Sequence, residues 1–126
     1  MRDFSGMKHI TNVQNLPKGG PYSHSVEYQG LIFVSGQTGN SPGKRLSFQE
    51  QFENSIKKIK TILEANGSSL ENMLKVTVYI SDPSYFLEMN SLFSKYFGET
   101  PPARTTIVAA FVEKDVLVEI DAIASK

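Results

Sequence analysis

The last quarter of the chain carries two charged residues inside segments that otherwise have the composition of β-strands. Arg104 precedes a run of β-branched residues in the segment 101–110, and Glu119 lies among valines and isoleucines in the segment 116–124. Arginine and glutamate contribute little to a packed sheet, so each needs another reason to be there. A guanidinium is a rigid fork of donors that matches a carboxylate with two parallel hydrogen bonds. We therefore interpret Arg104 as a candidate anion-binding residue.

Glu119 is the less specific of the two, because an outward-facing carboxylate in an alternating strand has the same pattern. Beyond Arg104, the apolar run from Ile107 to Phe111 predicts that its strand enters the interior of the protein. The turn between Val112 and Asp115 does not fix the register, so Arg104 and Glu119 can lie on one face of the sheet or on opposite faces.

Four further residues are weaker candidates for a binding site. Asn90 falls within the aromatic stripe of a predicted helix, where its amide either bonds to nearby backbone or faces a ligand. Tyr22 follows a stiff Gly-Gly-Pro loop. Ser35 and Gly36, at the end of a predicted strand, can offer a hydroxyl and amides to a ligand, although turn formation explains them equally well.

Other chemistries lack the residues they need. The sequence has no cysteine and only two histidines, His9 and His24, so it contains no metal-binding motif. No Gly-x-Ser-x-Gly elbow or phosphate-binding glycine loop occurs, and no cofactor motif is found. The run Lys57, Lys58 and Lys60 is interpreted as the solvated face of a helix rather than an RNA-binding patch.

Length and charge narrow the class of protein. The chain has 126 residues, which fits a single domain, and its 13 basic and 13 acidic residues give a formal net charge of zero. A balanced charge argues against a dedicated nucleic-acid binder. No apolar run is long enough for a transmembrane helix or a signal peptide, so we expect a cytoplasmic protein without a membrane partner.

Periodicity predicts two helices among several strands. A capping box of Ser47 and Glu50 starts the first helix, which Asn66-Gly67 ends, and Asp82-Pro83 starts the second, which ends at Gly98. Strands are expected at 25–28, 31–34, 74–80, 101–110 and 116–124, with a hairpin at Gln29-Gly30 and a loop over 35–43, while 9–13 is a candidate for an additional short strand. The strand, helix, strand order implies a parallel crossover.

These elements predict an α+β sandwich of order β-β-α-β-α-β-β. Its mixed sheet would carry both helices on one face. Nothing in the chain is left to cover the other face, so we expect subunits to pack sheet faces together in a closed homo-oligomer.

Four motifs together resemble those of a known family. They are Gly20-Pro-Tyr22-Ser, Val34-Ser-Gly-Gln37, Pro102-Ala-Arg104 and Val118-Glu-Ile-Asp-Ala-Ile-Ala124. Their order and spacing resemble the Rid (YjgF, L-PSP) family of reactive-intermediate deaminases over nearly the whole chain, residues 1–126. The resemblance implies a chorismate-mutase-like homotrimer with active sites in clefts between subunits. It also implies hydrolysis of 2-imino acids, such as 2-iminopropanoate (from 2-aminoacrylate) and 2-iminobutanoate, to 2-keto acids and ammonia, without a cofactor.

The resemblance also implies roles for individual residues. Arg104 would bind the substrate carboxylate and Glu119 would hold or activate the attacking water. Tyr22, Ser35, Gly36 and Asn90 would line the pocket. Thr106 stands where many members have a cysteine, so it offers a hydroxyl in place of a thiol.

Two alternatives stay open for the function. One is an endoribonuclease or translation inhibitor, as some members of the family have been described. The other is a small-metabolite binder without catalysis. The sequence does not identify the physiological imine, because the cleft walls would come partly from a neighbouring subunit.

Overall fold

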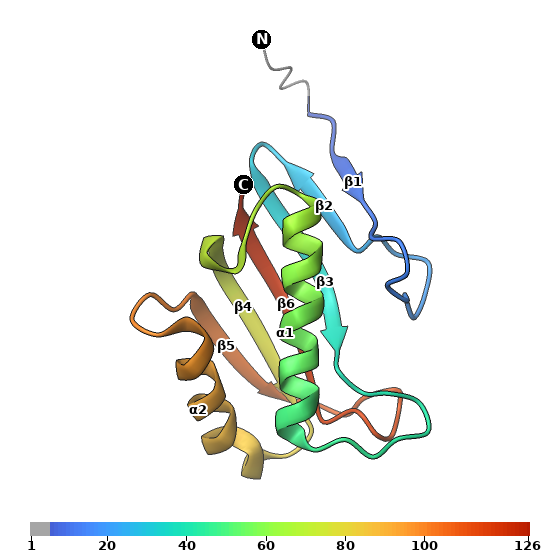
Figure 1. The fold of residues 1–126 in the computed structure, drawn as a ribbon, viewed down its shortest axis with the longest axis vertical. Coiled ribbons are helices and arrows are strands. Elements are labelled where there is room, and N and C mark those ends of the chain that lie inside the picture. Colours follow the sequence, from blue (N-terminus) through green and yellow to red (C-terminus); the bar gives the residue numbers. More distant parts are fainter. Residues whose placement is uncertain (1–5) are drawn as a thin grey trace.

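One mixed β-sheet organises the chain, seen in a computed structural model that describes residues 6–126 (Figure 1). The six strands lie in the order β1-β2-β3-β6-β4-β5. They are β1 His9–Thr11, β2 Ser25–Tyr28, β3 Leu31–Thr38, β4 Met73–Ile80, β5 Ala103–Val108 and β6 Val118–Ser125. The predicted α+β class with two helices is confirmed, and the short β1 adds a strand before the predicted order.

The C-terminal strand β6 inserts into the middle of the sheet. It pairs antiparallel with both β3 and β4, so β3 and β4 run parallel to each other with β6 between them. The predicted crossover therefore has the right direction but joins strands that are not neighbours. The last two strands are not paired either, because β4 separates β6 from the edge strand β5 and pairs with β5 in parallel.

Both helices end at the predicted residues and the first begins where predicted, whereas the predicted start of the second at Asp82-Pro83 forms a 3₁₀ turn and the α-helix begins at Phe86. In α1 Phe48–Ala65, Ser47 accepts from the Glu50 N–H and Glu50 accepts from the Ser47 N–H, which completes the capping box. Gly67 takes a φ of +76° after this helix ends. A 3₁₀ turn, Pro83–Tyr85, precedes α2 Phe86–Phe97, and another, Leu70–Asn72, precedes β4.

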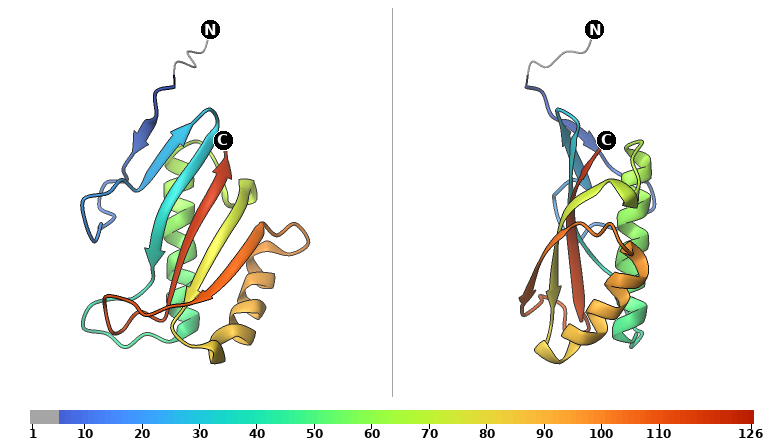
Figure 2. Two further views of the ribbon diagram at one scale, coloured as in Figure 1. Left: turned by 180° about the vertical axis from the view of Figure 1, so that it is seen from behind. Right: turned by 90° about the vertical axis from the view of Figure 1, so that its left-hand side faces the viewer.

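Both helices cover the same face of the sheet, as the edge-on view in Figure 2 shows. The core between them comprises Ile32, Val34, Phe48, Phe52, Ile56, Ile59, Ile62, Leu63, Met73, Val76, Val78, Ile80, Met89, Leu92, Phe93, Val118, Ile120, Ala122 and Ala124. The opposite face has no helix, and it leaves Phe33 and Ile107 each 43% exposed. Among residues 6–126, no helix is both long and apolar enough to cross a bilayer.

Three sequence expectations need correction. The first strand is shorter than predicted and ends at Thr11. The segment expected as a loop from residue 35 continues β3 as far as Thr38, because β6 supplies it with a partner strand. The apolar run after Arg104 does not enter the interior, since β5 is an edge strand and Val108 is 52% exposed.

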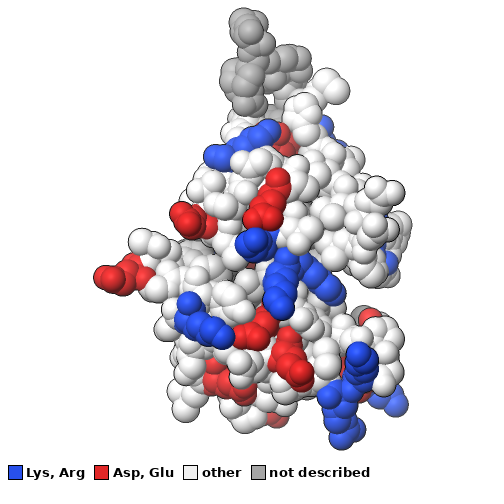
Figure 3. Space-filling model, viewed as in Figure 1, with Lys and Arg blue, Asp and Glu red and all other residues white. Residues whose placement is uncertain are grey.

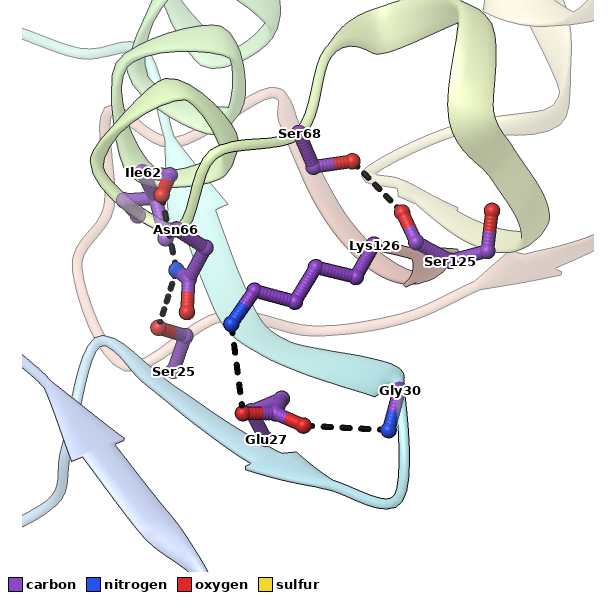
Figure 4. A network of polar contacts seen from close by, with 8 residues as sticks. All are labelled: Ser25, Glu27, Gly30, Ile62, Asn66, Ser68, Ser125 and Lys126. Carbon is purple, nitrogen blue, oxygen red and sulfur yellow. Dashed lines mark hydrogen bonds and ion pairs between the residues drawn. The ribbon is translucent and has the colours of Figure 1, made fainter. Parts of the chain in front are cut away.

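Polar contacts attach β2 and the turn after it to the C-terminal end of α1 and to the C-terminal residue of the chain (Figure 4). The carboxylate of Glu27, 5% exposed, accepts from the Gly30 N–H at 3.0 Å and lies 3.7 Å from Lys126 Nζ. Asn66 Nδ2 donates to Ser25 Oγ at 2.9 Å. Gln29 and Gly30 both have positive φ, as a type I′ hairpin turn requires.

Candidate functional site

A β-bulge in β3 builds the first part of the site. Val34 is aligned with Ala122 and Gln37 with Ile120, so Ser35 and Gly36 together face the single residue Asp121 of β6. The Ser35 N–H donates to the His24 carbonyl at 3.0 Å, and its hydroxyl donates to the Ser23 carbonyl at 2.7 Å. The hydroxyl of Ser35 thus anchors the bulge to the segment that follows Tyr22.

Glu119 lies directly over Gly36. A Cβ atom at position 36 would come within 2.9 Å of Glu119 Cδ and closer still to the carboxylate oxygen Oε2, so a side chain at this position would displace the carboxylate from where it lies. Burial raises the pKa of Glu119, and the negative charge of Asp121 raises it further. The carboxylate is therefore a stronger base than an ordinary glutamate.

Asp121 is held beside Glu119 by two hydrogen bonds from β4. It accepts from the Thr77 N–H at 3.2 Å and from the Tyr79 hydroxyl at 3.1 Å. Burial, together with Asp121, raises the pKa of Tyr79 and keeps it a donor. Tyr79 is aligned with Glu119 across the two strands, so all these groups share the uncovered face.

A pocket of about 500 Å³ opens beside Glu119. Because β2 begins at Ser25, which is aligned with Val34, the second half of β3 has β6 on one side only, and loops border the other side. The lining residues are Pro17, Lys18, Gly19, Tyr22, Gly36, Gln37, Thr38, Asn40, Pro42, Lys58, Phe111, Val112, Glu113, Val116 and Glu119. Tyr22 accepts from the Gly19 N–H at 2.9 Å through its hydroxyl, which fixes its ring at the pocket wall.

Arg104 lies on the other face of the sheet. It is aligned with Val76, whose side chain is buried beneath the helices, so Arg104 points toward α2. Its Cζ lies 4.8 Å from the ring centroid of Phe93 and 5.8 Å from that of Phe86. Within residues 6–126 its guanidinium makes no hydrogen bond or ion pair. Stacking therefore orients the guanidinium while its N–H donors stay available for an anion.

Thr106 and Asn90 accompany Arg104 on this face. The Thr106 hydroxyl lies 4.0 Å from Met89 Sδ, a weak contact that leaves the hydroxyl free to bond elsewhere. The side-chain amide of half-buried Asn90 has no hydrogen-bond partner within residues 6–126. The backbone-bonded alternative for Asn90 is thus not what the structure contains.

The predicted site residues form two groups that one chain keeps apart. Tyr22, Gly36 and Glu119 line the Glu119 pocket and Ser35 lies in the bulge next to it, whereas the Arg104 edge comprises Asn90, Arg104 and Thr106. Glu119 alternates with the buried residues Val118 and Ile120 and so faces away from the helices, opposite to Arg104. A ligand that contacts both groups needs a second copy of the chain.

Sequence reasoning missed Asp121, Tyr79 and Lys58. Asp121 could have been found, because it follows Glu119 by two residues on a strand. Lys58 was wrongly assigned to a solvated face: it is half-buried and donates to the Thr38 carbonyl at 2.7 Å. Its spacing from Gln51 and Ser55, both buried, places it beside the packed stripe of α1.

No metal centre accompanies these residues in the part of the chain that the structure describes, since no three His, Cys, Asp or Glu side chains gather there. His24 is 1% exposed and accepts from the Val13 N–H at 2.9 Å through Nδ1. It therefore has a structural position between β1 and β2.

Comparison with known proteins places this geometry in a family. Residues 13–126 match the sequence model of the family described as Endoribonuclease L-PSP. The RutC family protein PH0854 of Pyrococcus horikoshii is 39% identical over 95% of this chain and 99% of its own length. The Escherichia coli protein TdcF, whose name assigns it provisionally to the reactive intermediate deaminases, is 35% identical over 94% of this chain and 97% of its own.

Solved structures agree with the sequence match. The yeast protein YEO7 superposes with a TM-score of 0.86 at 34% identity, over 95% of this chain and 99% of that one. Escherichia coli TdcF, crystallised with bound serine, superposes with a TM-score of 0.83 at 33% identity, over 94% and 98% of the two chains. The chain therefore belongs to the L-PSP endoribonuclease family, also called the Rid or YjgF family.

Proposed function

We propose that this protein hydrolyses reactive 2-imino acids and their enamine tautomers to 2-keto acids and ammonia. The observation that carries the proposal is the guanidinium of Arg104, stacked on Phe93 with no anionic partner in residues 6–126. Such a group is suited to the carboxylate of a small acid. The likeness to TdcF, whose crystal structure contains an amino acid, supports a ligand of this class.

The complete site in this proposal is shared between two copies. The Arg104 edge of one copy meets the Glu119 pocket of the next, because the two groups face opposite sides of one sheet. The uncovered face, with Phe33 and Ile107 exposed, supplies the apolar contact surface. A closed homotrimer satisfies both requirements with one repeated interface.

The chemistry needs orientation and proton transfer but no cofactor. Arg104 binds the carboxylate and presents C2 of the protonated imine to water. The Glu119 carboxylate takes a proton from that water as its oxygen bonds to C2, which gives a carbinolamine. Glu119 returns the proton to the amine nitrogen; the C–N bond then breaks as the hydroxyl passes its proton to the Glu119 carboxylate, which gives it to the departing ammonia. Thr106 supplies a hydroxyl beside the carboxylate and no thiol, so no covalent step involves it.

The proposal is tested by imine decay. A threonine or serine dehydratase generates the imine in place, and its loss is followed with and without the protein. We expect Arg104→Ala to lower kcat/KM by about a hundredfold, since it removes two charge-assisted hydrogen bonds. Arg45→Ala, which removes an exposed arginine from the loop before α1, serves as the matched control.

Other outcomes would replace the proposal. Unchanged imine decay with saturable binding of 2-ketobutyrate would identify a metabolite binder. Cleavage of RNA that Arg104→Ala abolishes would identify a ribonuclease. Full deaminase activity in Arg104→Ala would remove Arg104 from the mechanism.

A further inference from the structure

A lysine that the proposed mechanism does not use lies in the wall of the Glu119 pocket. Lys58 extends from α1, and its amine donates to the backbone carbonyl of Thr38 at 2.7 Å. Its neighbours in sequence behave differently: Lys57 is exposed, and Lys60 forms a surface ion pair with Glu64 at 2.9 Å. Burial lowers the pKa of Lys58, against the opposing effect of Glu113, so desolvation works against the charge of this amine.

The carbonyl that Lys58 holds belongs to the strand end that supports Glu119. Thr38 is aligned with Glu119 across β3 and β6, and the bulge at Gly36 lies two residues earlier. Along this stretch β3 has no β2 residue aligned with it, since their pairing stops at Val34. Contacts from α1 therefore hold this part of β3 in place, where β2 does not pair with it.

Two more contacts strengthen this attachment. Asn54 Nδ2 donates to the Gly39 carbonyl at 3.1 Å. Gly39 itself lies so close to α1 that a Cβ atom would come within 2.6 Å of the Gln51 carbonyl carbon. The end of β3 is thus fixed to one helix by consecutive residues, and Lys58 is the contact nearest to Glu119 in the register.

We propose that Lys58 is a positioning residue for Glu119: by holding the Thr38 carbonyl it fixes the bulged end of β3 on which the carboxylate rests. The inference rests on the proposed function only for its kinetic consequence. A general base becomes less efficient when the strand that supports it moves and its carboxylate shifts away from the reacting atoms. Lys58 acts through the backbone and does not touch the substrate in this assignment.

The test compares three variants. Lys58→Met keeps the unbranched side chain and removes the donor, whereas Lys58→Arg keeps a charged donor. Lys57→Met is the matched control on the solvated side of the helix. We expect Lys58→Met to lower kcat about tenfold with little change in KM, whereas Lys58→Arg stays within about threefold of the parent. Melting temperatures establish that each variant is folded at the assay temperature.

An NMR titration of the Glu119 carboxyl carbon separates this inference from the proposed activity. If Lys58 positions Glu119, Lys58→Met exposes the carboxylate and its pKa falls toward the ordinary value. If Lys58 acted only as a nearby positive charge, its loss would raise that pKa instead. The groups that also face or share the pocket with Glu119, namely Asp121, Tyr79, Tyr22, Lys18 and Glu113, are unchanged in all three variants.

A raised pKa, or a titration and a kcat both unaltered by Lys58→Met, would overturn the assignment. An equal effect of Lys57→Met would overturn it as well. If the parent protein shows no imine hydrolysis, the titration still decides the role of Lys58.

Discussion

At the scale of single residues, the carboxylate of Glu119 lowers the stability of the folded protein. Its carboxylate is partly buried over Gly36 and lies next to Asp121, which together disfavour its charged form. A neutral side chain of the same shape would fit the same space without that cost. The position thus raises the pKa of the carboxyl group at the expense of the free energy of folding.

Replacement of Glu119 by glutamine should therefore stabilise the fold in a pH-dependent way. The folded-state pKa is raised above the ordinary glutamate value of 4.5, so the wild type loses stability as the pH rises through the folded pKa. Below the unfolded pKa both side chains are neutral and the difference vanishes. We expect Glu119→Gln to unfold at higher urea concentration at about pH 8 and at the parent concentration near pH 4.

Glu99→Gln, at an exposed position, is the control for this measurement. All samples are compared at one protein concentration, because subunit association also contributes to stability. A Glu119→Gln variant that is less stable than the parent at about pH 8 would mean that the carboxylate has a stabilising partner.

At the scale of elements, α1 is connected to both chain segments that border the Glu119 pocket. Gln51, 1% exposed, donates through Nε2 to the Asp115 carbonyl at 2.9 Å and accepts through Oε1 from the Leu117 N–H at 2.9 Å. These bonds fix the segment that leads into β6, and hence into Glu119. Lys58 and Asn54 fix the end of β3 from the same helix.

Gln51→Met should destabilise the protein by about 2 kcal/mol or more, because the partly buried backbone groups of Leu46, Asp115 and Leu117 lose their hydrogen bonds to the buried Gln51 amide. Gln49→Met, on the exposed side of the same helix, should change the free energy of unfolding by less than about 0.5 kcal/mol. Chemical denaturation of both variants at one protein concentration measures the difference. Equal midpoints would show that water replaces the Gln51 bonds.

Local signals explain which elements could be predicted. The capping box at Ser47 and the hairpin turn at Gln29-Gly30 depend on neighbouring residues, and both are confirmed. The bulge at Ser35 and Gly36 could not be predicted, since turn residues become strand only when β6 lies beside them. The faces of Arg104 and Glu119 likewise follow from the insertion of β6 between β3 and β4, a long-range pairing that periodicity does not encode.

At the scale of the whole molecule, the charge distribution bears on the choice of ligand. On the face that carries the helices, basic and acidic side chains are interspersed without a region of one sign (Figure 3). This face therefore lacks the continuous basic surface that an RNA-binding protein uses, and the net charge of the chain is zero. A small acid bound by one guanidinium requires no such surface.

Mixing two inactive variants tests whether the site is shared between copies. Arg104→Ala and Glu119→Gln should each lose most activity, because each lacks one half of the site. In randomly mixed closed rings, about one quarter of the sites would combine an intact Arg104 from one copy with an intact Glu119 from the next. We therefore expect the mixture to recover activity that neither variant has alone.

The control is a mixture of Arg104→Ala with the double variant, which contains no intact arginine and should stay inactive. Light scattering reports the assembly, for which we expect three times the chain mass of 14.0 kDa. A trimer whose mixture of single variants remains inactive would mean that both residues act within one chain. Such a result would require β5 to reorient, since in this structure the sheet holds Arg104 and Glu119 on opposite faces.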